Sequence, residues 1–112
     1  MSGRWPLLGA FAVALASGFL PASAGATQST TVKVEIRNFA FGPKALTIHA
    51  GTRVVWTNLD EEPHTVTSAG GAFKSSAALD TDDSYAVTFA RAGTYTYYCA
   101  IHPMMVGTVV VQ

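Results

Sequence analysis

The chain has 112 residues, of which 49% are hydrophobic and 12% are charged, and seven basic residues balance seven acidic ones. This length suits one domain, and the balanced charge offers no basic surface of the kind that binds nucleic acid. The single Cys excludes an internal disulfide, a four-cysteine zinc site and an iron–sulfur cluster held by this chain alone. Low charge with high apolar content also argues against intrinsic disorder.

Residues 1–24 have the composition of a secretory signal peptide. One charged residue, Arg4, precedes an apolar run from Leu7 to Leu20, Pro21 ends the run, and small residues follow up to Ala24. The run is shorter than the roughly 20 residues that a membrane-spanning helix needs, although an uncleaved anchor is the alternative. We expect cleavage after Ala24, or else after Ala26, and therefore export to the periplasm or the medium without stable membrane insertion.

After a short polar leader at residues 25–30, apolar and polar residues alternate in short segments separated by turn residues. Thr31–Asn38 is the clearest of these segments, with three apolar side chains on one face and three charged ones on the other. Residues 39–43 are predicted to form a turn, and residues 75–79 to include one helical turn. Strands are predicted at residues 31–38, 45–49, 53–58, 84–90, 94–99 and 106–112, and residues 64–67 are expected to be a short extended segment. This spacing predicts an all-β fold for residues 31–112, a Greek-key antiparallel β-sandwich.

The segment from Cys99 to Met105 carries the most chemical information. It places a thiol, the imidazole of His102 and two thioethers within seven residues, on a loop between two predicted strands. A second imidazole, His64, lies 35 positions before the Cys, directly after Pro63. Two His, one Cys and a distant Met are the ligands of a blue-copper electron-transfer site. Thiolate binds copper in both oxidation states, and a distant thioether favours Cu(I).

Each of these residues also has an ordinary explanation. A free Cys packs as a small hydrophobic residue, the two Met residues could fill the core, and His102 could lie on a solvated loop. It is less plausible that all of these ordinary explanations apply at once in an exported chain whose only Cys lies in this segment. His49 provides a contrast, because it is predicted to point outward from its strand with no thiol nearby, and we interpret it as a surface residue.

The motifs of the chain resemble those of the small bacterial cupredoxins, in particular the amicyanin and pseudoazurin group. The resemblance covers nearly the whole of residues 31–112, and its strongest pieces are Val55–Asn58, Pro63–Val66, Ala72–Lys74, Tyr85–Phe89, Ala92–Tyr95 and the loop Cys99–Met105 with its continuation to Val111. The Cys-x2-His-x2-Met spacing is similar to the short amicyanin-type loop. The resemblance implies a cupredoxin-like sandwich with one type 1 copper ion bound by His64, Cys99, His102 and Met105, and it places Met104 at a variable position.

The chain departs from the family pattern in both ligand loops. Thr65 stands where many relatives have an Asn that ties the loops together, and Ala100-Ile101 replaces a Thr-Pro or Ser-Pro pair. The hydroxyl of Thr65 could make part of the lost bond, and the resemblance implies that the backbone N–H of Thr65 donates to the Cys99 sulfur. Tyr95 resembles the tyrosine corner of Greek-key sandwiches, although it could simply be a half-buried strand residue.

Together these features predict a monomeric electron carrier that cycles between Cu(II) and Cu(I). We expect redox partner proteins to dock near His102, which lies on a predicted surface loop with apolar neighbours. The acidic residues Asp60, Glu61 and Glu62 could steer a basic partner, although an ordinary solvated turn is the alternative explanation for them. A copper chaperone or buffer is the alternative function, and a copper-independent binding module is a third. Three His cannot supply the further clusters of a multicopper oxidase, so we do not expect an enzyme.

Overall fold

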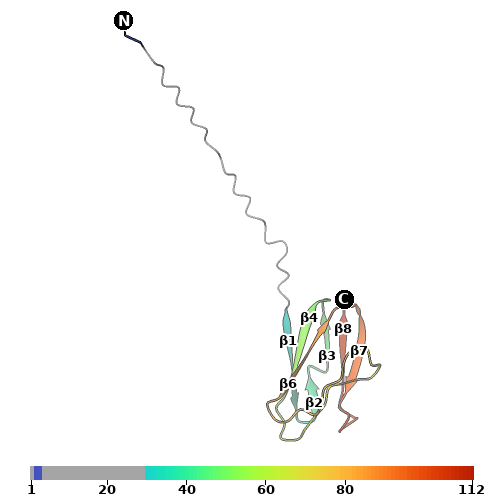
Figure 1. Ribbon diagram of the computed structural model, residues 1–112. Helices are drawn as coiled ribbons and strands as arrows, with labels where there is room; N and C mark the ends of the chain where they lie inside the picture. Colours follow the sequence, from blue (N-terminus) through green and yellow to red (C-terminus); the bar gives the residue numbers. More distant parts are fainter. Residues whose placement is uncertain (1, 4–29) are drawn as a thin grey trace.

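The computed structural model describes residues 2–3 and 30–112 (Figure 1). Except for residues 2–3 and Thr30, the predicted signal peptide (1–24) and the predicted leader (25–30) lie outside these described residues. No helix among the described residues is long and apolar enough to cross a membrane. The described chain consists of eight strands: β1 (Thr31–Arg37), β2 (Ala40–Gly42), β3 (Ala45–Ile48), β4 (Thr52–Asn58), β5 (Thr67–Ser68), β6 (Ser84–Phe89), β7 (Gly93–Tyr98) and β8 (Val106–Val111).

The strands form two four-stranded sheets, in the orders β2-β1-β4-β6 and β3-β8-β7-β5. The all-β sandwich predicted from the sequence is therefore confirmed, but its sheets are mixed rather than purely antiparallel. β1 pairs with β4 in parallel, and β3 pairs with β8 in parallel. Between β1 and β4 the chain crosses to the other sheet through β3, so β4 returns beside β1 in the same direction. Alternation of apolar and polar residues does not report strand direction.

Two local predictions were wrong. Residues 39–43, predicted as a turn, contain strand β2, whose central residue Phe41 is buried between two exposed neighbours. Residues 75–79, predicted to include a helical turn, have no helix, and Leu79 instead forms an isolated antiparallel bridge with His64. Both segments are too short for periodicity to reveal their structure, and their conformations depend on the strands beside them.

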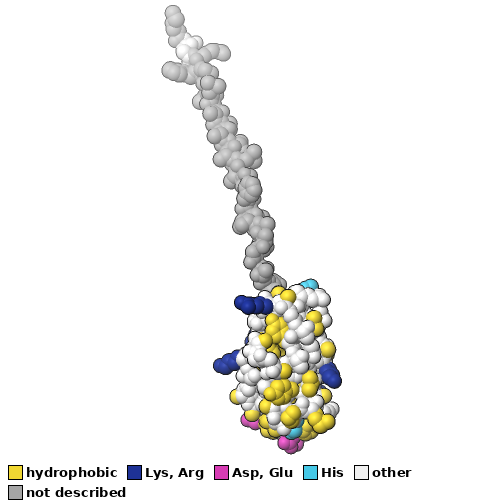
Figure 2. All heavy atoms as spheres, turned by 90° about the vertical axis from the view of Figure 1, so that its right-hand side faces the viewer, with side chains coloured by type: hydrophobic (Ala, Val, Ile, Leu, Met, Phe, Trp, Pro, Cys, Tyr) yellow, Lys and Arg dark blue, Asp and Glu magenta, His cyan; other side chains and the backbone are white. Residues whose placement is uncertain are grey.

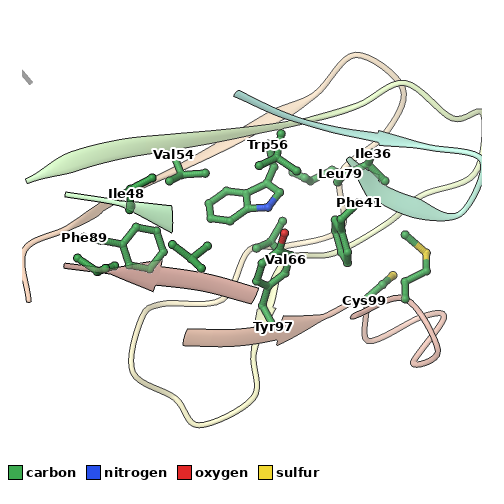
Figure 3. Packing of buried hydrophobic residues seen from close by; sticks show 14 residues of the cluster. Ile36, Phe41, Ile48, Val54, Trp56, Val66, Leu79, Phe89, Tyr97 and Cys99 are labelled. Atoms are coloured by element: carbon green, nitrogen blue, oxygen red, sulfur yellow. The ribbon is translucent and has the colours of Figure 1, made fainter. Parts of the chain in front are cut away.

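The core lies between the sheets and is rich in aromatic side chains (Figure 3). Trp56 and Tyr97 are fully buried, with ring centroids 5.3 Å apart and ring planes 78° apart. Tyr97 also packs edge-on against Phe41, with centroids 4.7 Å apart. Gly107 on the neighbouring strand makes room for this phenol, because a Cβ there would lie 2.3 Å from Tyr97 Cζ. The core therefore depends on close packing around Tyr97, two residues before Cys99.

The predicted tyrosine corner is confirmed. Tyr95 is half-buried, and its hydroxyl donates a hydrogen bond of 2.7 Å to the carbonyl oxygen of Arg91. Such a bond to backbone a few residues upstream defines the corner. It anchors the start of β7, the strand that leads into the loop Cys99–Met105 (Figure 1).

Candidate metal centre

Three potential metal ligands from two distant segments meet at one end of the sandwich. The atoms His64 Nδ1, Cys99 Sγ and His102 Nδ1 lie within 4.8 Å of one another. The sulfur is 3.7 Å from His64 Nδ1 and 3.8 Å from His102 Nδ1, and the two nitrogens are 3.2 Å apart. His49, in contrast, is exposed and is not part of this group, as its position in the sequence suggested.

An isolated backbone bridge to Leu79 fixes the position of His64. Its N–H donates to the carbonyl oxygen of Leu79 over 3.1 Å, and its own carbonyl oxygen accepts from the Leu79 N–H over 2.7 Å. The Asn58 side-chain amide donates to the carbonyl oxygens of Glu62 and Leu79, which ties the loop after β4 to the same segment. His64 is completely buried as a result.

The second ligand loop closes on itself through its backbone. The Cys99 N–H donates to the Met105 carbonyl oxygen over 3.0 Å, and the Met105 N–H donates to the His102 carbonyl oxygen over 2.9 Å. This closure turns Met105 inward, where it is 5% exposed, whereas Met104 is 97% exposed. Burial therefore separates two Met residues that the sequence leaves as neighbours in the same motif.

Thr65 links the two ligand loops. Its backbone N–H donates to Cys99 Sγ over 3.3 Å, and its Oγ1 accepts a hydrogen bond of 2.7 Å from the backbone N–H of Ala100. Both contacts agree with the predictions made from the sequence. The hydroxyl thus provides a side-chain connection between the two loops.

The three donor atoms have the spacing that a shared ion requires. Nitrogen and sulfur ligands about 2.0–2.3 Å from one ion lie roughly 3.3–3.7 Å from one another. The observed separations of 3.2, 3.7 and 3.8 Å lie within or close to this range. A thiol beside two imidazoles is also a donor set that binds copper in preference to the hard cations magnesium and calcium. The residues present therefore fit a bound copper ion.

Two residues that the sequence did not single out as part of the site lie against it. Asp60 Oδ2 is 2.8 Å from His64 Nε2, so the carboxylate contacts the ring nitrogen that faces away from the sulfur. The ring of Phe39 packs edge-on against both imidazoles, with centroids 5.3 Å from His64 and 5.0 Å from His102. No local signal distinguishes Asp60 from the acidic residues that follow it, and Phe39 lies 25 or more positions from both His residues.

Hydrogen bonds keep Asp60 ionised. Partial burial on its own would raise the pKa of the carboxyl, but it is outweighed by hydrogen bonds from the Phe39 N–H, from His64 and from the Asn38 N–H, so the pKa is lowered below 3.8. The side chain is only 11% exposed. The sequence suggested Asp60 as one of three residues that could steer a partner, but its carboxylate points inward to the site.

Comparison with known proteins identifies relatives along most of the chain. The model of the cupredoxin-like domain family matches residues 8–111. The amicyanin-alpha of Methylorubrum extorquens is 39% identical over 108 residues, which cover 88% of this chain and 86% of that protein. The plastocyanin of Prochlorothrix hollandica is 32% identical over 114 residues, which cover 89% and 87% of the two chains.

Solved structures of related proteins share the fold. The structure of a reduced amicyanin mutant superposes with a TM-score of 0.70 at 30% identity and covers 73% of this chain and 82% of that chain. A purple cupredoxin from Nitrosopumilus maritimus superposes with a TM-score of 0.67 at 33% identity and covers 72% and 99%. Both the sequence and the structure therefore lead to the same group of proteins.

Proposed function

The chain belongs to the cupredoxin-like family, and from this premise we propose that it is an exported type 1 blue-copper protein that carries single electrons between redox partners. The observation that carries the proposal is the convergence of His64 Nδ1, Cys99 Sγ and His102 Nδ1 within 4.8 Å. Its relatives, the amicyanins and plastocyanins, are electron carriers rather than enzymes.

We propose that His64, Cys99 and His102 would hold the ion as its three strong ligands and that the Met105 thioether would be the weak fourth ligand. Copper supplies a one-electron couple when it is bound. The protein supplies a rigid set of donors, because Thr65 and Met105 hold Cys99 by hydrogen bonds and Asp60 holds His64. Donors fixed before the electron arrives need little rearrangement when the charge of the site changes.

An apolar surface around His102 is the proposed docking site for redox partners. His102 is half-buried, and the large apolar side chains exposed among the described residues are Phe39, Ile101, Met104 and Val106. A hollow of about 360 Å³ is lined by Phe39, by His102 and by the residues Pro103 to Met105. A small apolar surface favours the brief contacts that electron carriers make. His102 is therefore the proposed point of electron entry and exit.

Exposed acidic residues near this apolar surface favour a partner with a basic face. We define the acidic rim as Glu61, Glu62, Asp82 and Asp83, all of which are exposed. Hydrogen bonds of Asn58 with the backbone of Asp82 and Asp83 hold the two acidic segments together. Figure 2 shows acidic and apolar side chains together at the lower end of the sandwich in this view, with Lys and Arg along its sides. This separation of charge would orient a basic partner toward His102.

Export and a monomeric state complete the proposal. The composition of residues 1–24 supports a cleaved signal peptide, and the periplasm or the medium is the proposed location. A copper chaperone or buffer is the alternative function. The burial of Cys99 and His64 at 0% exposure disfavours it, because fast transfer of an ion requires accessible ligands.

The test is to express the full chain, purify the exported protein and add Cu(II). An intense visible thiolate-to-copper absorption band should appear, disappear on reduction and return on oxidation. The Cys99→Ser variant should lack this band, whereas Met104→Ala, which changes an exposed neighbour, should keep it. Absence of the band from the wild-type protein would refute the proposed function, and exchange of copper with a chelator within seconds would favour a chaperone or buffer.

A further inference from the structure

The carboxylate of Asp60 makes three contacts at the end of the sandwich that carries the proposed copper site. Its Oδ1 accepts a hydrogen bond of 2.6 Å from the Asn38 N–H, and its Oδ2 accepts one of 2.9 Å from the Phe39 N–H. The same Oδ2 lies 2.8 Å from His64 Nε2. One carboxylate therefore connects a proposed copper ligand to the segment between β1 and β2.

This connection holds backbone in an unusual conformation. Asn38 and Phe39 have φ angles of +53° and +56°, in the left-handed region that non-glycine residues seldom adopt. The N–H groups of both residues donate hydrogen bonds to the Asp60 carboxylate. The resulting turn places the Phe39 ring against both imidazoles of the site.

The contact between Asp60 and His64 also determines which nitrogen of the imidazole ring carries the proton. Since Nδ1 faces the Cys99 sulfur and would hold the ion, the proton of the neutral imidazole must be on Nε2, where it donates to Asp60. A negatively charged acceptor makes the imidazole a stronger electron donor, as in other carboxylate–histidine–metal arrangements. The Asp60 side chain is 11% exposed, and no Lys or Arg of the described residues pairs with it, so its charge is only weakly screened.

We propose that Asp60 is a positioning residue that lowers the reduction potential of the copper site through its charged hydrogen bond to His64, an inference that rests on the function proposed above. The negative charge and the stronger imidazole donor both favour the ion of higher charge. Asp60 therefore stabilises Cu(II) relative to Cu(I), and its neutral replacement should make the site easier to reduce.

The test compares Asp60→Asn with Asp80→Asn in the copper-loaded protein. Asp60→Asn keeps the size of the side chain but removes its charge. Asp80 is exposed, directly follows the bridge residue Leu79 and makes no side-chain contact with His64, so its variant controls for the loss of one nearby charge. Asp60→Asn should raise the equilibrium Cu(I)/Cu(II) ratio against a fixed redox mediator at least tenfold, which is about 59 mV for one electron.

The control should change that ratio less than twofold. Equal shifts in the two variants, or no shift in Asp60→Asn, would overturn the proposal. The proposed function would survive that result, because it depends on the absorption band of the wild-type protein. Conversely, a wild-type protein without the band would refute the function before any potential is compared.

A measurement on the wild-type protein keeps the proposal testable if Asp60→Asn does not fold. In the Cu(I) form, which is diamagnetic, the His64 Nε2 proton should give a resolved NMR signal that exchanges slowly with solvent. An Nε2 proton that exchanges as fast as the proton of an exposed imidazole, such as that of His49, would contradict the hydrogen bond and therefore the proposal.

Discussion

Thr65 and Cys99 are 34 positions apart in the chain, yet the Thr65 backbone N–H donates a hydrogen bond of 3.3 Å to the Cys99 sulfur. The Thr65 hydroxyl accepts another of 2.7 Å from the residue after the Cys, Ala100. A single residue thus restrains the sulfur and connects the two ligand loops. The hydrogen bond from the backbone N–H to the sulfur can form with any residue except Pro at position 65. The hydrogen bond to the hydroxyl, in contrast, depends on the Thr side chain.

Thr65→Val should therefore weaken the copper-free protein without abolishing the site. The variant keeps the N–H to the sulfur but leaves the Ala100 N–H without its acceptor, and we expect the free energy of unfolding to fall by about 1–2 kcal/mol. Urea unfolding of the copper-free protein measures this change. Thr65→Ser retains the oxygen and should unfold close to the wild type, so equal losses in the two variants would contradict the role of the hydroxyl.

Gly107→Ala should disrupt the core below the site. A Cβ at this position would lie 2.3 Å from Tyr97 Cζ and 2.4 Å from its hydroxyl oxygen, and the ring is buried and cannot move aside. Overpacking of this kind costs about 1–3 kcal/mol of stability. Gly70→Ala is the matched control, because a Cβ added at that residue would meet nothing within 4 Å. A Gly107→Ala protein as stable as the Gly70→Ala protein would show that the strand yields easily.

Tyr97 should make the protein less stable at alkaline pH. Burial raises the pKa of Tyr97 above 10.0, although the neighbouring Trp56 side chain offsets part of this rise. Because the phenol ionises more readily in the unfolded chain, its contribution to stability is constant below pH 10 and falls as the pH rises toward the native pKa. The loss approaches about 1.4 kcal/mol per pH unit.

Unfolding of the wild type and of Tyr97→Phe between pH 8 and 11 isolates this contribution from that of the other titrating groups. The Phe variant should lose stability less steeply above pH 10, and the two proteins should show parallel pH dependence below that value. Parallel curves over the whole range would mean that the buried phenol ionises as easily in the folded protein as in the unfolded chain.

Met104→Glu should slow electron exchange between copies of the protein. Met104 is 97% exposed at the apolar surface proposed for docking, so a charge there would have to be desolvated, or would face a like charge, in each encounter. We expect the second-order self-exchange rate constant, measured by NMR on mixtures of Cu(I) and Cu(II) protein, to fall at least tenfold with little change in reduction potential. His49→Glu places the same charge on a residue outside this surface and should change the rate less than twofold.

Much of the site could be predicted from the sequence because its main parts are local. The loop from Cys99 to Met105 contains three of the four proposed ligands, and its spacing is visible without knowledge of the fold. Thr65 follows His64 directly, and its two contacts could also be anticipated, because the resemblance to the cupredoxins implies a link between the ligand loops at this position. Alternation in Thr31–Arg37 and in the other longer strands was sufficient to predict a β-sandwich.

What the sequence determined by itself was the all-β class and the set of copper-type donors, because periodicity and residue spacing act over a few positions. The tertiary structure decided the parallel pairing of β1 with β4 and the burial that distinguishes Met105 from Met104. It also decided the contact between Asp60 and His64 and the place of Phe39 over both imidazoles. These relationships depend on how separate loops fold back on one another, and the energies that select them come from contacts between residues far apart in the chain.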